Sequence, residues 1–87
     1  MNSRRLLARL KQGALDNVSF ADAEKLALDL GFWLDRIQGS HHIYRHRLLR
    51  GAERLNLQPL NREAKNWQLK QLLFYVERYN LTLGEDR

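Results

Sequence analysis

The sequence predicts an α+β domain in which a helix, a three-stranded antiparallel sheet and a long final helix follow one another, after a short extra helix. Two segments repeat apolar residues every three or four positions, as amphipathic helices do. Between them, short alternating segments flank Gly39-Ser40, a dipeptide that favours a tight hairpin. The 87 residues are enough for one core and too few for two. We therefore expect a single domain over 1–87, with a core at 18–81 and an N-terminal extension at 1–17.

Two helices are expected before the sheet. Residues 3–11 carry leucines at helical spacing and form the short extra helix. Residues 20–30 form the clearer one, because Ser19 with Asp22 three positions later resembles a capping box. Gly31 suits the left-handed position that ends a helix. This second helix is the one expected to cover the sheet.

Three strands are expected next, the first two as a hairpin over 32–38 and 41–47. After a basic loop, the third strand runs over 54–58, and Pro59 ends it because proline cannot donate to the ladder. Helices on one face of this sheet would complete the α+β unit.

The final helix is expected from residue 66 to 79 or 80, with Asn66 as its N-cap and Asn80 as its left-handed stop. Its stripe of apolar residues must pack against the rest of the domain. The aromatic residues expected in the core are Phe20, Phe32, Trp33 and Phe74. For Trp67 the sequence leaves two interpretations open, packing and stacking on a nucleic-acid base.

Composition excludes several classes of protein. Without cysteine there is no disulfide framework and no thiolate metal site. No apolar run approaches the length of a membrane-spanning helix, and the first residues lack the apolar segment of a signal peptide. These features predict a cytoplasmic protein.

The net charge of +5 is unevenly distributed. The segment 36–70 holds eight of the fifteen basic residues but only two of the ten acidic ones. Such a patch favours a polyanion such as RNA as the partner, against the alternative of a merely solvated surface. Lys65 and Lys70 flank the first turn of the final helix and are the leading phosphate contacts. The full set of expected RNA-binding residues is Arg36, Arg45, Arg47, Arg62, Lys65 and Lys70.

The most informative stretch is Gly39-Ser40-His41-His42-Ile43-Tyr44. Histidine can accept and donate a proton near neutral pH, so histidines among arginines suggest proton transfer on a phosphate-bearing substrate. Successive strand residues point to opposite faces. If Ile43 points to the helices, His41 shares its face, while His42, Tyr44 and His46 lie on the uncovered face. His42 is then the catalytic candidate, unless a bulge shifts the register by one residue and exchanges the two histidines. The candidate supporting residues are Gly39, Ser40, His41, Tyr44 and His46.

A metal site is not expected. His42 and His46 would suit a zinc ion on a helix, but on a strand they lie about 13 Å apart. One ion cannot bridge that distance, and no cofactor is expected either.

On these residues the chain resembles the HicA-type toxins of bacterial toxin–antitoxin pairs, over about 18–81. The Gly-Ser-His-His turn is the most specific part, and Arg62-Glu63-Ala64-Lys65 with Gln68-Leu69-Lys70-Gln71-Leu72-Leu73 is similar to a second family block. The resemblance implies a fold related to double-stranded-RNA-binding domains and a small ribonuclease that cleaves mRNA. It also implies inhibition by a HicB-type antitoxin, and it assigns catalysis to His42.

The chain departs from this family in two places. Many members carry a further histidine after a proline, whereas this chain reads Pro59-Leu60-Asn61, and residues 1–17 extend beyond the family core. An alternative is a non-catalytic RNA-binding domain of the double-stranded-RNA-binding type, because fold does not fix function. A DNA-binding repressor is a weaker alternative, because the final helix leaves little surface for reading bases.

Overall fold

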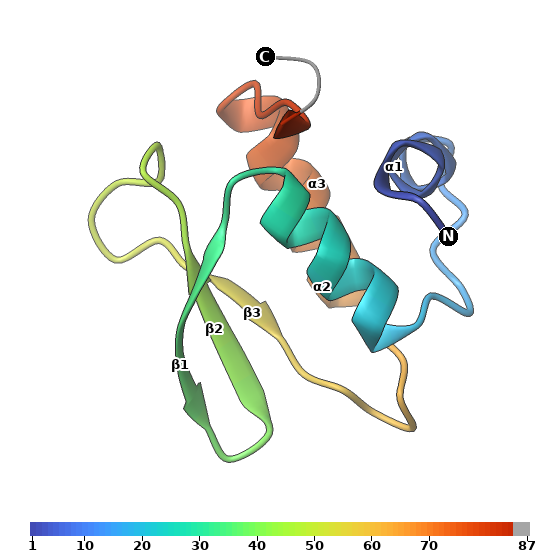
Figure 1. Cartoon of the computed structure of the whole chain (residues 1–87), viewed down its shortest axis with the longest axis horizontal. Coiled ribbons are helices and arrows are strands. Elements are labelled where there is room, and N and C mark those ends of the chain that lie inside the picture. Colours follow the sequence, from blue (N-terminus) through green and yellow to red (C-terminus); the bar gives the residue numbers. More distant parts are fainter. Residues whose placement is uncertain (85–87) are drawn as a thin grey trace.

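The α+β prediction is confirmed in the computed structural model, which describes residues 1–84. The last three residues of the predicted domain, 85–87, lie outside the described residues. The described elements are α1 (Ser3–Lys11), α2 (Phe20–Asp29), β1 (Trp33–Gln38), β2 (His41–Arg45), β3 (Leu55–Leu57) and α3 (Asn66–Arg78) (Figure 1).

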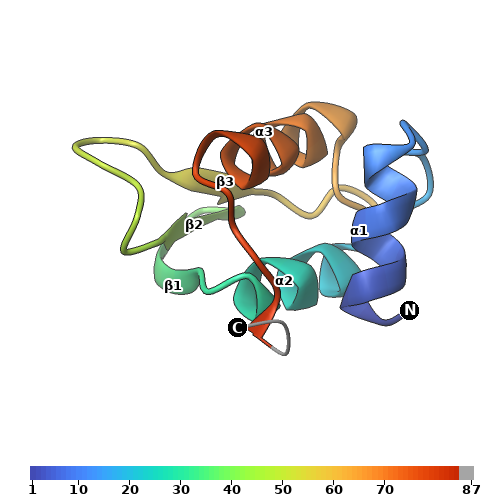
Figure 2. The same ribbon diagram turned by 90° about the horizontal axis from the view of Figure 1, so that it is seen from above.

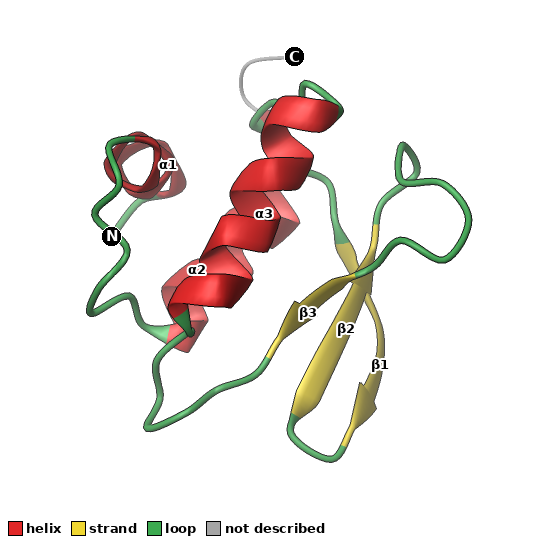
Figure 3. Ribbon diagram, turned by 180° about the vertical axis from the view of Figure 1, so that it is seen from behind, coloured by secondary structure: helices red, strands yellow, loops and turns green. Residues whose placement is uncertain are grey.

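The strands form an antiparallel sheet in the order β1-β2-β3, with β2 in the centre (Figure 3). The predicted hairpin is present, because Gly39 and Ser40 join β1 to β2 and Gly39 takes a left-handed φ of +60°. In β1 the ladder is interrupted by a bulge between Leu34 and Arg36.

Helices α2 and α3 cover one face of this sheet, and α1 packs against them on the side away from the strands (Figure 2). The core lies between the sheet and the two covering helices. Its fully buried side chains include Leu26 and Leu30 of α2, Tyr44 of β2, Leu55 of β3 and Leu72 of α3. The other face of the sheet carries no helix among the described residues, and we call it the open face.

The start of α2 is capped as predicted. The Asp22 amide donates a 3.0 Å hydrogen bond to Ser19 Oγ. At the other end, Gly31 takes a left-handed φ of +99°, and Phe32 behind it is buried.

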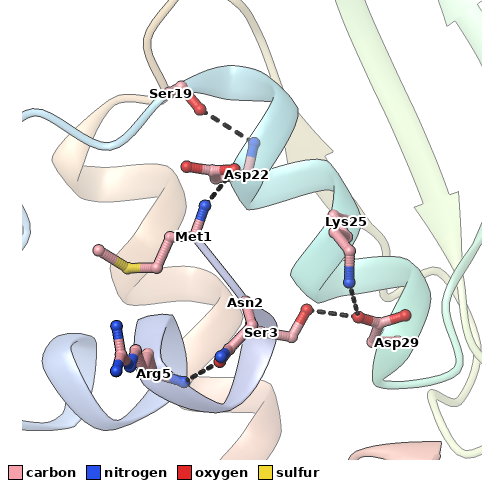
Figure 4. A network of polar contacts seen from close by, with 8 residues as sticks. All are labelled: Met1, Asn2, Ser3, Arg5, Ser19, Asp22, Lys25 and Asp29. Carbon is pink, nitrogen blue, oxygen red and sulfur yellow. Dashed lines mark hydrogen bonds and ion pairs between the residues drawn. The ribbon is translucent and has the colours of Figure 1, made fainter.

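The first helix is tied to α2 by polar contacts (Figure 4). The Ser3 hydroxyl donates to the Asp29 carboxylate, which also accepts a 2.8 Å hydrogen bond from Lys25 Nζ. The terminal ammonium of Met1 lies 3.5 Å from the carboxylate of Asp22. These contacts add to the burial of Leu6, Leu7 and Leu10, which pack α1 against the helical layer.

The start of α3 differs from the prediction, because its N-cap is Lys65 and not Asn66. The Lys65 amide donates to Gln68 Oε1 at 3.2 Å, which satisfies the N-cap backbone. The Asn66 side chain turns away and donates to Asp16 Oδ1 at 3.2 Å. Asn80 has a φ of +53° and ends the helix as predicted.

The predicted facing of β2 was wrong. Tyr44, not Ile43, faces the helices: its ring is fully buried in the core and its hydroxyl donates to Glu24 of α2. His42 shares that face and contacts Phe20 of α2, whereas Ile43 lies with His41 on the open face, where it is nevertheless only 8% exposed. An aliphatic residue was assumed to point inward, but the larger tyrosine fills more core volume and finds a partner for its hydroxyl on α2.

Two aromatic predictions were also wrong. Trp33 is 46% exposed and Phe74 is 56% exposed, because one lies on the edge strand and the other on the outer side of α3. Phe32 is buried, and Phe20 is partly buried against the core, as predicted. None of the described helices has the length and apolar character needed to cross a membrane.

Candidate functional site

Four segments lie along the lower side of the molecule in Figure 1, which we call the hairpin end: the turn 39–42 on one side, and the start of α2, the segment 58–65 and the start of α3 on the other. The Phe20 amide donates a 2.8 Å hydrogen bond to the Arg62 carbonyl, which joins α2 to the segment. Gln58 Nε2 donates to Ser40 Oγ at 2.9 Å, which joins the segment to the turn. The turn that carries the histidine pair is therefore joined to the first residue of this segment, four residues before Arg62.

His42 lies at the rim of this end, on the helix-covered face. Its ring packs edge-on against Phe20, with ring centroids 4.7 Å apart, and it is half-buried. Its Nδ1 lies 3.2 Å from the Ser40 carbonyl oxygen. Because a carbonyl only accepts, Nδ1 carries the proton in this contact. The neutral ring then has its lone pair on Nε2, which meets no partner among residues 1–84. His42 is thus positioned to accept a proton.

His41 lies on the open face and is exposed. Its Nδ1 is 3.3 Å from Asn56 Oδ1 on the neighbouring strand. Since adjacent strand residues point to opposite sides, the two rings address different surfaces. The sequence pair His41-His42 therefore does not form a single acid–base dyad.

His46 has a structural role. It is 6% exposed, and its ring packs edge-on against Phe32 at 4.9 Å. Nε2 donates to the Leu30 carbonyl at the end of α2 over 2.9 Å, and Nδ1 accepts from the Leu48 amide over 3.1 Å. With both nitrogens engaged and the ring buried, His46 lies away from any substrate surface.

Tyr44 is likewise removed from the site, although it was a candidate supporting residue. Burial, together with the hydrogen bond to Glu24, raises the pKa of Tyr44 far above its ordinary value. The phenol therefore stays protonated and inside the core. Of the predicted supporting group, only Ser40 contacts His42, and Gly39 lies in the same turn, whereas His41 lies on the open face.

The expected RNA-binding residues fall into separate groups. Arg62, Lys65 and Lys70 lie at or next to the hairpin end and are exposed. Arg36 and Arg45 lie on the open face, where the Arg36 guanidinium is 3.7 Å from the neighbouring Asp35 carboxylate. Arg47 follows β2 at the opposite end of the sheet. Only the first group lies at the same end of the molecule as His42.

A tight turn presents Arg62. Leu60 and Glu63 exchange two backbone hydrogen bonds of 2.9 Å, so Asn61 and Arg62 occupy a two-residue loop. Both have positive φ, +51° and +65°, which is the geometry of a type I′ turn. The turn leaves the guanidinium exposed, beside the backbone link to Phe20.

Sequence reasoning missed two features of the site. Phe20 was assigned to the core alone, yet it also supports the His42 ring. Asn56, which holds His41, was not singled out. Both contacts cross between elements, so no local pattern in the sequence marks them. Among residues 1–84, no group of three histidine or acidic side chains is arranged to hold a metal ion.

Comparisons with known proteins return no match, whether against models of protein families, curated proteins or solved structures.

Proposed function

We propose that this chain is the toxin of a bacterial type II toxin–antitoxin system, a HicA-type mRNA interferase that cleaves RNA by histidine chemistry without a metal ion. The observation that supports this best is His42 at the hairpin end. Its Nδ1 is tethered to the Ser40 carbonyl and its Nε2 is available to accept a proton, while Phe20, which its ring contacts, is hydrogen-bonded to the backbone of Arg62.

In this mechanism His42 is the general base. Nε2 takes the proton of a ribose 2′-hydroxyl, and the 2′-oxygen attacks the adjacent phosphorus. The bond to the 5′-oxygen of the next nucleotide breaks, and that oxygen takes a proton from solvent. The product carries a 2′,3′-cyclic phosphate. Arg62 and Lys65 stabilise the charge that develops on the phosphate oxygens. A positioned base contributes about 10²–10⁴-fold to such a reaction, which yields a modest enzyme.

A toxin requires an inhibitor, so the proposed partner is a HicB-type antitoxin in the bacterial cytoplasm. The chain is basic, with a net charge of +5. We expect the antitoxin to place an acidic surface over the hairpin end, because opposite potentials steer and select partners. A complex that leaves His42 open would require inhibition by distortion instead.

The alternative is a non-catalytic RNA-binding domain of the double-stranded-RNA-binding type. The element order α2-β1-β2-β3-α3, with both helices on one sheet face, favours it. Simple binding does not require a tethered histidine, and that contact favours the enzyme.

The deciding experiment incubates the purified protein with an end-labelled single-stranded transcript, with and without EDTA. We expect cleavage in both, with 2′,3′-cyclic phosphate ends. Loss of cleavage on chelation, restored by a divalent ion, would contradict the mechanism. Binding without any cleavage would favour the alternative.

A further inference from the structure

The exposed Trp67 answers a question that the sequence leaves open. It is the second residue of α3 and is 52% exposed, so it is not a core residue. It lines a groove between the start of α3, the turn at 60–63 and the loop before α2. The groove is also lined by Asp16, Asn17, Leu60, Asn61, Lys65 and Lys70.

The groove has a defined shape. Asn17 and Asn61 both take left-handed φ angles, +58° and +51°. The Asn66 amide donates to Asp16 Oδ1, and the Arg9 guanidinium donates to the Asp16 carbonyl, so the loop is tied to α1 and α3. Left-handed non-glycine residues persist where the surroundings hold them, often at ligand sites. Trp67 is thus an exposed aromatic side chain beside a fixed groove.

The charges along the groove suit a nucleotide. Lys65 and Lys70 are exposed on one helix, whereas Asp16 and Glu63 also line the groove. A pocket for a simple anion would not include two carboxylates. A nucleic-acid base carries hydrogen-bond donors, hydrogen-bond acceptors and an aromatic face. It therefore fits a groove that has positively and negatively charged side chains, two asparagines and an exposed indole. The lysines can then contact the flanking phosphates.

Backbone contacts join the lining of the groove to the start of α2, which contacts His42. Ser19 and Glu63 form a backbone bridge, the Phe20 amide donates to the Arg62 carbonyl, and the Phe20 ring contacts His42. A single strand of RNA could therefore follow the surface from one feature to the other.

We infer that Trp67 is a stacking platform for one unpaired base of single-stranded RNA, with Lys65 and Lys70 on the adjacent phosphates. This inference rests on the proposed function, since it names the substrate as single-stranded at this position. Base–aromatic stacking tolerates every base, so the platform sets strand state and register rather than sequence.

The chain offers a matched internal control, because it has two tryptophans of similar exposure. Trp33 is 46% exposed on β1, and Trp67 is 52% exposed on α3. In a His42→Ala background, which prevents cleavage, Trp33→Phe leaves Trp67 as the sole indole and Trp67→Phe leaves Trp33. Each variant is titrated with a short oligouridylate and with the same RNA annealed into a duplex, while indole emission is recorded.

We expect the single-strand titration to quench Trp67 and leave Trp33 unchanged, and the duplex to quench Trp67 less. In parallel, Trp67→Ala should weaken single-strand binding by about 5- to 150-fold, the range reported for losing one stacked base. Trp67→Phe should retain most of the affinity because it keeps an aromatic face, and Trp33→Ala should bind as the parent does.

Three results would overturn the inference: RNA binding without a change in Trp67 emission, equal quenching of both tryptophans, or a Trp67 signal that responds to an antitoxin protein but not to RNA. The emission arm does not depend on whether Trp67→Ala folds. Quenching of Trp67 in a protein whose parent form never cleaves RNA would support the platform and refute the ribonuclease. RNA cleavage by the parent without any change in Trp67 emission would support the ribonuclease and refute the platform.

Discussion

A histidine near each end of β2 faces the helices, His42 within the strand and His46 just after it, and the two have opposite surroundings. At the hairpin end, His42 is half-buried and keeps Nε2 without a partner among the described residues. Past the other end of the strand, His46 is buried, and both of its nitrogens are bound to backbone groups. Residue type and facing are the same, so the difference comes from what the neighbouring backbone offers.

The number of ring nitrogens that are already hydrogen-bonded distinguishes a structural histidine from one that is able to transfer a proton. His46 caps a carbonyl at the end of α2 and fixes the path of the chain after β2. His42 has one nitrogen held by its own turn, which orients the ring without consuming its lone pair. A buried histidine with two backbone partners stabilises the fold, while a tethered histidine at a rim can transfer a proton.

The sharpest test of this comparison replaces His42 and His41 in turn. We expect His42→Ala to reduce the rate of RNA cleavage by about 10²–10⁴-fold, since it removes the proposed base. Its free energy of unfolding should fall by less than about 1 kcal/mol, because the ring is only half-buried. His41→Ala, exposed on the open face, should retain cleavage and stability. Rates on a labelled transcript and denaturant unfolding measure both.

The opposite pattern would relocate the site. If His41→Ala is folded but inactive while His42→Ala cleaves normally, the substrate lies on the open face with Arg36 and Arg45. The hairpin end would then have no catalytic role.

The second test is His46→Ala, which should affect stability and not chemistry. It removes the packing against Phe32 and leaves the Leu30 carbonyl and the Leu48 amide without the imidazole. We expect the free energy of unfolding to fall by about 2–4 kcal/mol. Cleavage by the folded fraction should stay near the parent rate. A stable but inactive His46→Ala would contradict the structural assignment.

Much of the fold can be predicted from the sequence because its signals are local. The capping pair Ser19 and Asp22, the left-handed Gly31 and the turn at Gly39 each set a boundary through their own backbone chemistry. Such local signals do not predict which side chains of β2 point into the core. It depends on which side chain best fills a core built from distant elements, and Tyr44 does so with Glu24 as its partner.

The arrangement of the candidate site could be predicted only in part, because some of it is local in the sequence and some depends on contacts between distant elements. The position of His42 next to the turn is local, and the choice of His42 over His41 was argued from a facing that proved inverted. His42 remains the candidate because of contacts with Phe20 and Ser40 that no sequence pattern displays. The role of His46 likewise depends on the end of α2, sixteen residues earlier in the chain.

The smallest expected effect lies away from both ends of β2, where α1 joins α2. The hydrogen bond from Lys25, followed by that from Ser3, lowers the pKa of Asp29. A carboxyl with a lowered folded-state pKa stabilises the fold above its unfolded pKa, about 3.9, and loses that contribution as the pH falls through the folded value. We expect Asp29→Asn to cost about 0.5–1 kcal/mol at pH 7, since the carboxylate is partly exposed.

Chemical unfolding of Asp29→Asn and the parent across acidic and neutral pH measures this effect. The difference in their unfolding free energies should become smaller below about pH 4. Asp35→Asn, an exposed carboxylate on β1, is the matched control and should differ from the parent by less than about 0.5 kcal/mol throughout. If the difference in unfolding free energy between Asp29→Asn and the parent does not change with pH, the stabilisation does not come from the charge of the Asp29 carboxylate.

The bulge between Leu34 and Arg36 has a consequence for how copies of this chain behave in a crowded solution. Strand β1 is an edge, and Trp33, Leu34 and Ile37 are all exposed on it. A straight edge of that composition would be a template for strand-by-strand aggregation into fibrils. The bulge breaks the regular spacing of the amides and carbonyls of β1, and Asp35 and Arg36 place charges at the centre of the strand. Both features disfavour the pairing of β1 with a strand of another molecule.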